Sequence, residues 1–299
     1  MHGCGNDYVF LDCFSNRVPE DPSRLAVSIS DRNRGVGGDG LVLMLPAETP
    51  DTVARMRMFN ADGSEGSLCG NALRCMAMWL HQSQNMGSEF RIAMGDRLIN
   101  VFVVDSDAQI RSANIRIEIG QPVIQSPSAN GRAMFVRSVD LPDLHLPSLI
   151  AAPIFVSMGN PHTILFVRSL DSVDFFKLGP LIEHHPEFPN RTNVEFVEIQ
   201  PLSGTESIAK VRVWERGSGE TMACGSGACA VTVAGIATGL LPDHATATTI
   251  AMRGGNLRIL WDRSHSVFLE GPAVESFRGV FVDSGDENML TTAKDCLAK

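Results

Sequence analysis

Two cysteines of this chain stand in closely similar stretches of sequence. Residues 59–75 read FNADGSEGSLCGNALRC, and residues 214–230 read WERGSGETMACGSGACA. Laid over each other without a gap, the two stretches place Cys69 on Cys224. A thiolate can remove a proton and a thiol can deliver one, so two thiols on opposite faces of one carbon could invert its configuration. The paired cysteines therefore indicate general acid–base chemistry.

Each cysteine stands at the expected start of a helix and is followed by glycine and a small polar residue. The two pairs are Gly70–Asn71 and Gly225–Ser226. The first free N–H groups of a helix, with its dipole, bind an anion such as a carboxylate, and glycine lets a ligand approach the backbone closely. The same field is expected to lower the pKa of the thiol. Two such helix starts converging on one carboxylate would hold an α-amino acid, with one sulfur on each face of its α-carbon.

The helices that must carry these cysteines are predicted from apolar spacing. Residues 70–81 have apolar side chains at helical intervals. Residues 225–238 are apolar almost all round, which is typical of a helix buried on every side, as inside a barrel. Shorter helices are predicted over 22–30 and 178–184. Strands are predicted over 8–14, 41–45, 55–59, 89–94, 98–104, 113–119, 153–157, 163–167, 194–199, 209–214, 248–252, 257–261, 267–269 and 279–282, with turns at 3–7 and 159–162 and a loop at 35–40.

Similar residues recur at a nearly constant interval along the chain. Asn160 lies 154 residues after Asn6, and Ala251 lies 158 residues after Ala93. A constant offset indicates an internal duplication. We predict an α+β fold of two pseudo-symmetric lobes, each a curled, mostly antiparallel sheet around a central helix. A small molecule would bind in the cleft between the lobes.

The best linker candidate is the stretch rich in Pro, Ser, Gln and Gly at residues 120–132, GQPVIQSPSANGR. It divides the chain into an N-terminal lobe over 1–125, which carries Cys69, and a C-terminal lobe over 126–299, which carries Cys224. The last strand is expected to pack back on the first lobe.

Composition excludes several classes of protein. The 299 residues are 44% hydrophobic and carry a formal net charge of −9, which disfavours nucleic acid and anionic membranes as partners. No apolar run approaches the length of a membrane span, and the start MHGCGNDYVF lacks the features of a signal peptide. Seven cysteines, an odd number without an export signal, favour a reducing compartment, and we predict a cytoplasmic protein.

No cofactor is predicted. None of the cysteines is spaced as CxxC, so a metal site is unsupported. Only four lysines occur, and none has a Gly-rich setting, which disfavours pyridoxal phosphate. The sequence GVGGDG at 35–40 is not a dinucleotide fingerprint.

At these residues the chain closely resembles the diaminopimelate epimerase family. The matching motifs are MHGCGNDY (1–8), DRNRGVGGDG (31–40), FNADGSEGSLCGNALRC (59–75), GNPH (159–162), NVEF (193–196) and ERGSGETMACGSGACA (215–230). The resemblance implies a pyridoxal-independent epimerase that interconverts LL- and meso-diaminopimelate by two-base proton transfer. It also implies a role in making lysine and peptidoglycan precursors.

Site residues are implied by the same resemblance. Cys69 and Cys224 would be the catalytic bases, and His162 would position groups near the α-centre beside Asn160. The residues implied for the α-carboxylate cradle are Gly70, Asn71, Gly225 and Ser226. The residues implied for the distal end of the substrate are Asn6, Asn60, Asn193, Glu215 and Arg216. An arginine suits the distal carboxylate because it binds bidentately, and Glu215 suits the distal ammonium.

The chain departs from the family pattern in places. After Cys69 the family usually reads GNGxR, whereas this chain has Ala72 and Leu73, so packing is expected to change and the chemistry to survive. Gly40 stands where some members place a glutamine that contacts the substrate. We expect Glu65 and Glu220 to order their turns rather than contact the substrate. Arg74 is interpreted as a helix-face residue.

Two other functions stay open. A sister racemase of the same fold would act on another amino acid, such as histidine. An imidazole side chain, however, would not make use of Glu215 and Arg216, which suit a second zwitterionic end. A thiol-redox or binding protein would use Cys69 and Cys224 as a switchable disulfide, which leaves the carboxylate cradle without a purpose. A homodimer is one of the oligomeric states left open.

Overall fold

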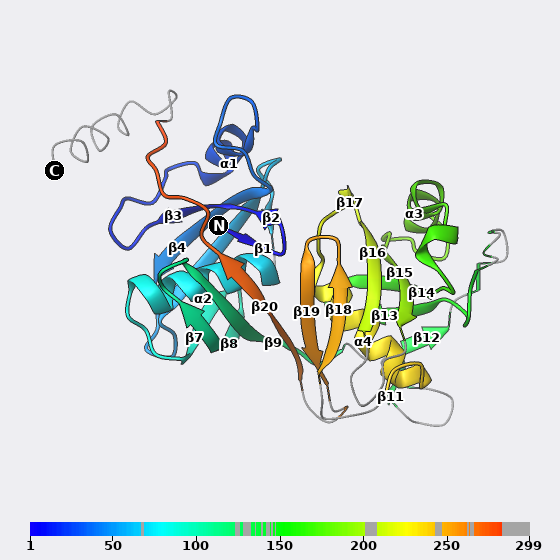
Figure 1. Ribbon diagram of the computed structural model, residues 1–299. Helices are drawn as coiled ribbons and strands as arrows, with labels where there is room; N and C mark the ends of the chain where they lie inside the picture. The colour runs from blue at the N-terminus through cyan, green and yellow to red at the C-terminus, as the bar shows by residue number, and fades with distance from the viewer. Residues whose placement is uncertain are drawn as a thin grey trace. The chain divides into compact units, whose positions relative to one another are not determined.

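The computed structural model describes residues 1–66, 69–122, 126–127, 133–134, 136–138, 140–141, 144, 146, 148–200, 208–242, 247–261, 263 and 266–282. The chain forms two compact units (Figure 1). The first comprises Met1–Ile115 and the described residues from Pro272 onward, and the second comprises Arg116–Gly271. The sequence analysis placed the lobe boundary at residue 125, and the first break between compact units lies at Ile115.

The first unit contains two helices and a sheet. Its elements, in order, are β1 His2–Gly3, β2 Asn6–Asp7, β3 Val9–Asp12, α1 Pro22–Ser30, β4 Gly40–Pro46, β5 Ala54–Asn60, β6 Glu65–Gly66, α2 Gly70–Ser83, β7 Glu89–Met94, β8 Arg97–Asp107 and β9 Ser112–Gly120, whose last residues belong to the second unit. Helix α1 begins at Pro22, where the side chain of Asp21 caps it by accepting the N–H of Arg24 at 3.0 Å.

The second unit repeats this plan. Its elements are β10 Ser126–Pro127, β11 Ala133–Met134, β12 Val136–Ser138, β13 Ile154–Ser157, β14 Pro161–Phe166, the 3-10 helix η1 Leu170–Ser172, α3 Phe175–Glu183, β15 Asn193–Gln200, β16 Ile208–Glu215, β17 Gly219–Glu220, α4 Gly225–Thr238, β18 Thr248–Met252, β19 Gly255–Leu260 and β20 Val267–Val274, which ends in the first unit.

Strand pairing repeats from one unit to the other. The pairs β3–β4 and β5–β7 are parallel and β4–β5 and β7–β8 antiparallel, just as β14–β15 and β16–β18 are parallel and β15–β16 and β18–β19 antiparallel. The register also repeats, since Arg55 faces Ala93 and Lys210 faces Ala251. These pairs are related by offsets of 155 (210 − 55) and 158 (251 − 93). Matching registers support the predicted duplication.

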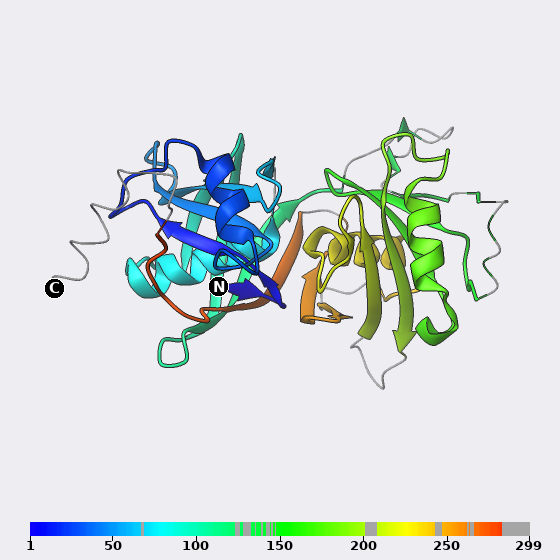
Figure 2. The same ribbon diagram turned by 90° about the horizontal axis from the view of Figure 1, so that it is seen from above.

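In each unit the sheet curls around one buried helix, α2 in the first and α4 in the second (Figures 1 and 2). Helix α4 contacts β12, β13, β14, β15 and β19, and its residues from Ala228 to Gly235 are all buried. A helix surrounded in this way cannot have a polar face, which explains its composition. Helix α2 contacts β1, β5 and β8. The predicted α+β fold with curled sheets around central helices is confirmed.

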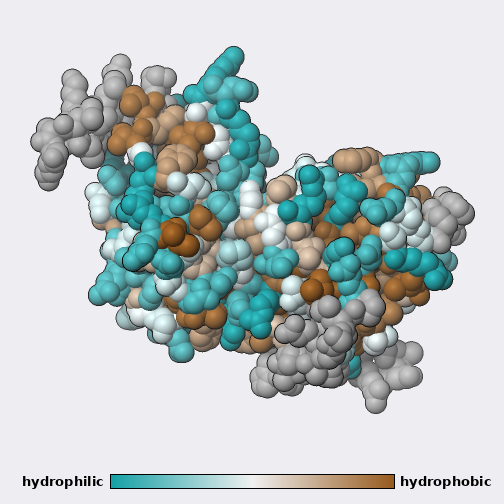
Figure 3. All heavy atoms as spheres, viewed as in Figure 1, coloured by the Kyte–Doolittle hydropathy of each residue, from teal (hydrophilic) through white to brown (hydrophobic). Residues whose placement is uncertain are grey.

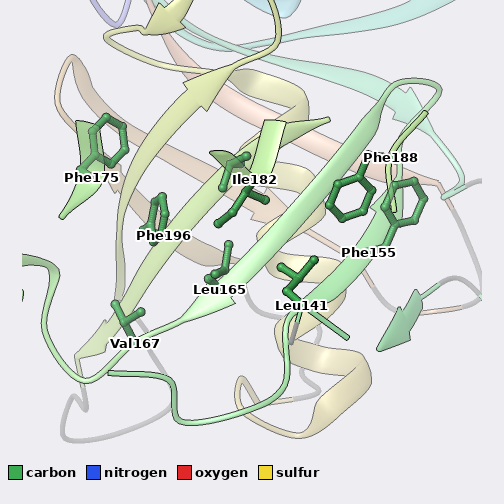
Figure 4. Packing of buried hydrophobic residues seen from close by; sticks show 9 residues of the cluster. Leu141, Phe155, Leu165, Val167, Phe175, Ile182, Phe188 and Phe196 are labelled. Atoms are coloured by element: carbon green, nitrogen blue, oxygen red, sulfur yellow. The ribbon is translucent and has the colours of Figure 1, made fainter. Parts of the chain in front are cut away.

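A separate apolar cluster covers the sheet of the second unit. Figure 4 shows Phe175 and Ile182 of α3 beside Phe196 of β15 and Leu165 of β14. The ring centroids of Phe175 and Phe196 lie 5.6 Å apart, an edge-to-face contact that favours one packing geometry. This cluster supports the strands that lead to the second cysteine.

Three local predictions need comment. Residues 279–282 are not a strand: Val280 and Val282 are 66% and 52% exposed, and apolar alternation without a sheet partner does not make one. The turn at 159–162 ends at Asn160, because Pro161 already pairs with Ser157. Most of the expected linker over 120–132 lies outside the described residues, although Ser126–Pro127 within it pairs with Ala133–Met134.

Exposed apolar residues are scattered. Figure 3 shows a face on which hydrophilic and hydrophobic areas are interspersed, with one larger hydrophobic area at the upper left. Scattered exposed apolar side chains are ordinary for a folded protein. Among the described helices, none has both the length and the apolar character needed to cross a membrane.

Candidate active site

Cys69 caps the start of α2. Its backbone is extended, and its sulfur accepts the N–H of Ala72 at 3.5 Å, while the Leu73 N–H bonds the Cys69 carbonyl at 3.0 Å. The sulfur also lies 3.3 Å from the hydroxyl oxygen of Tyr8, in a hydrogen bond. Cys69 is partly exposed. The helix start therefore directs its free amides at a reachable sulfur.

Cys224 occupies the same N-cap position at the start of α4, although its side chain forms no capping hydrogen bond. Its backbone is extended, its carbonyl accepts the Ala228 N–H at 3.0 Å, and its sulfur lies 3.5 Å from the hydroxyl oxygen of Ser226. The charge of Glu215 acts on the same thiol, and the Glu215 carboxyl accepts the hydroxyl of Thr221. Cys224 is 6% exposed, so this thiol is more enclosed than Cys69.

The thiol pKa values differ from the expectation. Burial raises the pKa of Cys69, while hydrogen bonds from Tyr8 and the backbone of Ala72 oppose that rise. Burial also raises the pKa of Cys224 well above its ordinary value, and the charge of Glu215 raises it further. The backbone hydrogen bonds at the two helix starts act to lower the pKa of each thiol, as expected. Desolvation of the buried sulfurs raises each pKa by more, so the net change is a rise.

The other residues predicted in the first unit lie at turns and helix starts. Gly70 and Asn71 form the first turn of α2, and Asn71 is 3% exposed. Asn6 is 8% exposed and lies in β2, directly after the turn that begins the chain. Asn60 ends β5, where its amide donates to the Ser64 hydroxyl at 2.9 Å.

His162 belongs to a hydrogen-bonded chain that leads to Cys224. Its Nδ1 lies 2.6 Å from Glu195 Oε1, and both side chains are fully buried. Its Nε2 lies 3.0 Å from Asn160 Oδ1, and the Asn160 amide donates to Ser226 Oγ at 3.2 Å. Ser226 in turn contacts the sulfur. The chain links His162 to Cys224 through Asn160 and Ser226 within the second unit.

Asn193 and Arg216 are linked to each other. The Asn193 amide donates to the Pro161 carbonyl at 2.8 Å, and its oxygen accepts the Arg216 N–H at 2.9 Å. Both the nitrogen and the oxygen of this side-chain amide therefore form hydrogen bonds with backbone groups. Arg216 is exposed, and its guanidinium donates to the Asn190 carbonyl at 3.1 Å.

The turns before the two cysteines are held by equivalent ion pairs. Arg57 donates to Glu65 at 2.8 Å, and Arg212 donates to Glu220 at 2.9 Å. Arg212 follows Arg57 by 155 residues (212 − 57), the cysteine offset. These contacts agree with a turn-ordering role for the two glutamates.

Three residues in contact with the site were not singled out from the sequence. Tyr8 and Glu195 lie within the quoted motifs MHGCGNDY and NVEF, but no pattern assigned them a role. Thr221 donates its hydroxyl to Glu215. Their contacts join strands distant in sequence, which spacing alone does not show. Among the residues that the structure describes, no group of three or more His, Cys, Asp or Glu could hold a metal ion.

Comparison with solved structures shows the fold. A phenazine biosynthesis protein from Bacillus anthracis superposes with a TM-score of 0.65 at 16% identity, covering 95% of each chain. A probable proline racemase from Agrobacterium radiobacter gives a TM-score of 0.64 at 14% identity, covering 96% of this chain and 93% of its own. At such identity the likeness concerns the fold alone.

Comparison of sequences shows the family. The family described as diaminopimelate epimerase matches residues 1–124 and 154–275. A diaminopimelate epimerase from Pelotomaculum thermopropionicum is 42% identical over 284 residues, covering 94% of this chain and 96% of its own. One from Acetivibrio thermocellus is 39% identical over 288 residues, covering 93% and 96%. With two cysteines capping equivalent helices, this chain belongs to the diaminopimelate epimerase family.

Proposed function

We propose that this protein interconverts LL- and meso-diaminopimelate by moving the α-proton between two sulfur atoms. The observation that carries the proposal is the pair of cysteines, Cys69 and Cys224, each at the N-cap of a helix whose backbone N–H groups act to lower the pKa of its thiol. Family membership over nearly the whole chain supports the same activity.

The chemistry follows from the two half-sites. We name the first half-site Cys69 with Gly70, Asn71 and Tyr8, and the second Cys224 with Gly225, Ser226 and Glu215. One sulfur removes the α-proton as a thiolate, and the other delivers a proton as a thiol. The amides at the two helix starts stabilise negative charge that builds on the α-carboxylate. This reaction requires both sulfurs to act on one α-carbon.

Glu215 supplies the proton acceptor of the second half-site. Its charge acts on the Cys224 thiol, so the carboxyl is placed to take the proton when the thiol becomes a thiolate. This proximity supports a role at the reacting sulfur. The resemblance assigns Glu215 to the distal ammonium instead, and the position of its carboxyl beside the sulfur favours the first role.

The distal end of the substrate is proposed to bind Arg216. Its guanidinium is exposed, and among the described residues it keeps donors beyond its bond to Asn190. Asn193 fixes the backbone of Arg216 and so orients it. Asn6 and Asn60 of the first unit are proposed as further contacts with the distal group.

The wider setting is also proposed. The proton transfer uses groups of the protein, so the activity is expected to be independent of pyridoxal phosphate. The product serves lysine and peptidoglycan precursor synthesis, and the enzyme would act in the cytoplasm. A homodimer is one possible oligomeric state, and a measurement of the molecular mass in solution would test it.

The test is proton exchange followed by NMR. Purified protein, with reductant and without added pyridoxal phosphate, is mixed with LL-diaminopimelate in deuterated water. We expect loss of the α-proton signal together with appearance of the meso isomer. Exchange with histidine but not with diaminopimelate would move the assignment to a sister racemase. Absence of exchange with any amino acid would favour a thiol-redox protein.

Two variants test the mechanism in the same assay. Cys69→Ala and Cys224→Ala should each abolish epimerisation, because one sulfur cannot act on both faces of the carbon. Loss of activity in oxidant and recovery in reductant would show that the free thiols are needed. Near-normal turnover in either alanine variant would rule out the two-base mechanism.

A further inference from the structure

Arg74 is a fully buried cation in the first turns of α2. Its exposed fraction is 0%, although arginine is among the residues most seldom buried. Its Nη2 donates to Asn71 Oδ1 at 2.8 Å and lies 4.0 Å from Cys4 Sγ, and its Nε donates to the Pro272 carbonyl at 3.4 Å. Its Nη1 is buried and has no hydrogen-bond partner among the described residues.

No carboxylate in the described part of the chain pairs with this guanidinium. Among the residues that the structure describes, none forms an ion pair with Arg74, whereas other arginines of the first unit pair with Asp or Glu. Burying an unpaired charge is costly, so a buried guanidinium with a free N–H calls for an anion. The thiolate of Cys69 and the substrate carboxylate are the anions that the proposed function brings to this helix start.

One contact of Arg74, the hydrogen bond to Asn71, leads to the first half-site. Asn71 joins Arg74 to the sulfur, since its side chain accepts from Arg74 and its backbone N–H bonds Cys69 Sγ. The turn that begins the chain closes over the guanidinium, because a Cβ on Gly3 would lie 2.9 Å from Arg74 Nη2. The other titratable groups near this position are Tyr8, Cys4, Cys75 and the Met1 amino group.

The duplication shows that the fold does not need this charge. The position equivalent to Arg74 in α4 is Cys229 (74 + 155), an apolar side chain that is fully buried. The second half-site has charge of the opposite sign, because the negative charges of Glu215 and Glu195 raise the pKa of Cys224. Two equivalent sulfurs thus lie in opposite electrostatic surroundings.

We propose that Arg74 is a positioning residue of the first half-site. Its guanidinium orients Asn71 at the start of α2, and its uncompensated charge favours the thiolate of Cys69. The catalytic meaning of this role rests on the proposed epimerisation, but the charge effect on Cys69 does not depend on the substrate.

The test measures how fast iodoacetamide alkylates each cysteine, by peptide mass spectrometry of the intact folded chain over a range of pH. In Arg74→Met we expect Cys69 to react about tenfold more slowly below its titration midpoint, because an opposite charge nearby shifts a pKa by about one unit or more. Cys224 serves as the internal control and should keep its wild-type rate. Arg74→Lys, which retains the charge, should restore most of the Cys69 rate.

Further variants allow the alkylation test to decide the proposal even if one variant does not fold. Methionine should be tolerated, since replacing a buried charge by an apolar side chain is often neutral for stability. Arg74→Gln is a second uncharged variant for the case that Arg74→Met does not fold. Arg17→Met removes a charge from an exposed ion pair and should leave both rates unchanged. Unchanged Cys69 reactivity in a folded, uncharged variant would overturn the proposal.

Kinetics with diaminopimelate separate this inference from the proposed function. We expect Arg74→Met to lower kcat and to move the pH dependence of kcat/KM to higher pH, whereas a purely structural role would change only the melting temperature. If the wild type shows no epimerisation, the proposed function fails while the alkylation result still decides the role of Arg74. If epimerisation is normal and the pH dependence is unmoved, the Arg74 inference alone fails.

Discussion

Cys69 and Cys224 occupy equivalent positions, yet their side chains meet different neighbours. A tyrosine hydroxyl contacts the first sulfur, a serine hydroxyl contacts the second, and the charge of Glu215 raises the pKa of the second thiol. An epimerase that works in both directions must use each sulfur as base and as acid in turn. In the proposed mechanism, the two thiols would therefore gain and lose their protons through different neighbours.

Glu215 gives the second sulfur a pH dependence with a definite sign. Burial raises the pKa of Glu215 above its ordinary value of 4.5, and hydrogen bonds from Thr221 and Cys224 offset part of that rise. Between the ordinary and the raised pKa, the folded chain binds more protons than the unfolded chain. The contribution of Glu215 to the free energy of unfolding therefore falls as pH rises through that window.

Glu215→Gln should remove this contribution, because glutamine does not ionise. Relative to wild type, we expect the variant to gain stability as pH rises from below 4.5 toward neutrality, and to lose about 100-fold in epimerisation rate because the proton acceptor is absent. Urea unfolding at several pH values measures the first effect. Glu65→Gln is the control of opposite sign, because the hydrogen bond from Arg57 lowers the pKa of Glu65. A stability difference independent of pH would contradict this account.

At the scale of the elements, patterns in the sequence located much of the fold. Helix α4 begins at Gly225 and ends at Thr238, as predicted, because apolar residues on every side and a preceding cap define it locally. Helix α1 also has its predicted bounds, set by Asp21 and Pro22. The repeated motifs also indicated which strands correspond, since the pairing of Arg55 with Ala93 recurs 155 to 158 residues later.

Contacts between distant elements could not be predicted in this way. Glu195 lies on β15, within the strand predicted over 194–199, and nothing local indicates that it meets His162 on β14. Arg74 was interpreted as a helix-face residue, and its complete burial depends on the turn at Gly3 and on β20. Such environments arise from tertiary packing, which periodicity does not encode.

Gly227 in the first turn of α4 is required by that packing. A Cβ at this position would lie 2.6 Å from Glu195 Oε1 and 3.4 Å from Cys224 Sγ. The Glu195 carboxyl cannot easily move away, because it is buried and held by His162. The equivalent position in α2 is Ala72 (72 + 155 = 227), where the first unit accommodates a methyl group without changing the helix.

Gly227→Ala should therefore be destabilising. Alanine improves helix propensity by about 1 kcal/mol, but overpacking against a fixed side chain costs about 1–3 kcal/mol and displaces the sulfur. We expect lower stability in urea unfolding and a loss of kcat. Gly87→Ala is the matched control, since a Cβ at Gly87 meets nothing within 4 Å. If a Gly227→Ala variant were as stable and active as wild type, the Glu195 side chain would be able to move away from the added methyl group without cost.

At the scale of the whole molecule, the two units differ in how the chain builds them. The second is one continuous stretch, Arg116–Gly271, whereas the first combines residues from the beginning of the chain with those after Pro272. The ends of the continuous stretch are tied together. Glu270 accepts from Arg116 at 2.7 Å and from Arg258 at 2.7 Å, with its own side chain only 5% exposed.

A fragment of residues 116–271 should therefore fold alone. It retains its own apolar cluster and the ion pairs that join its ends, so we expect one cooperative thermal transition by circular dichroism. It should show no epimerisation, because Cys69 is absent, while Cys224 should keep its full-length alkylation rate. Glu270→Gln should destabilise the fragment by about 1–2 kcal/mol, since two charge-assisted hydrogen bonds weaken while both arginines stay partly solvated. A fragment without a cooperative transition would mean that the second unit depends on the first for its stability.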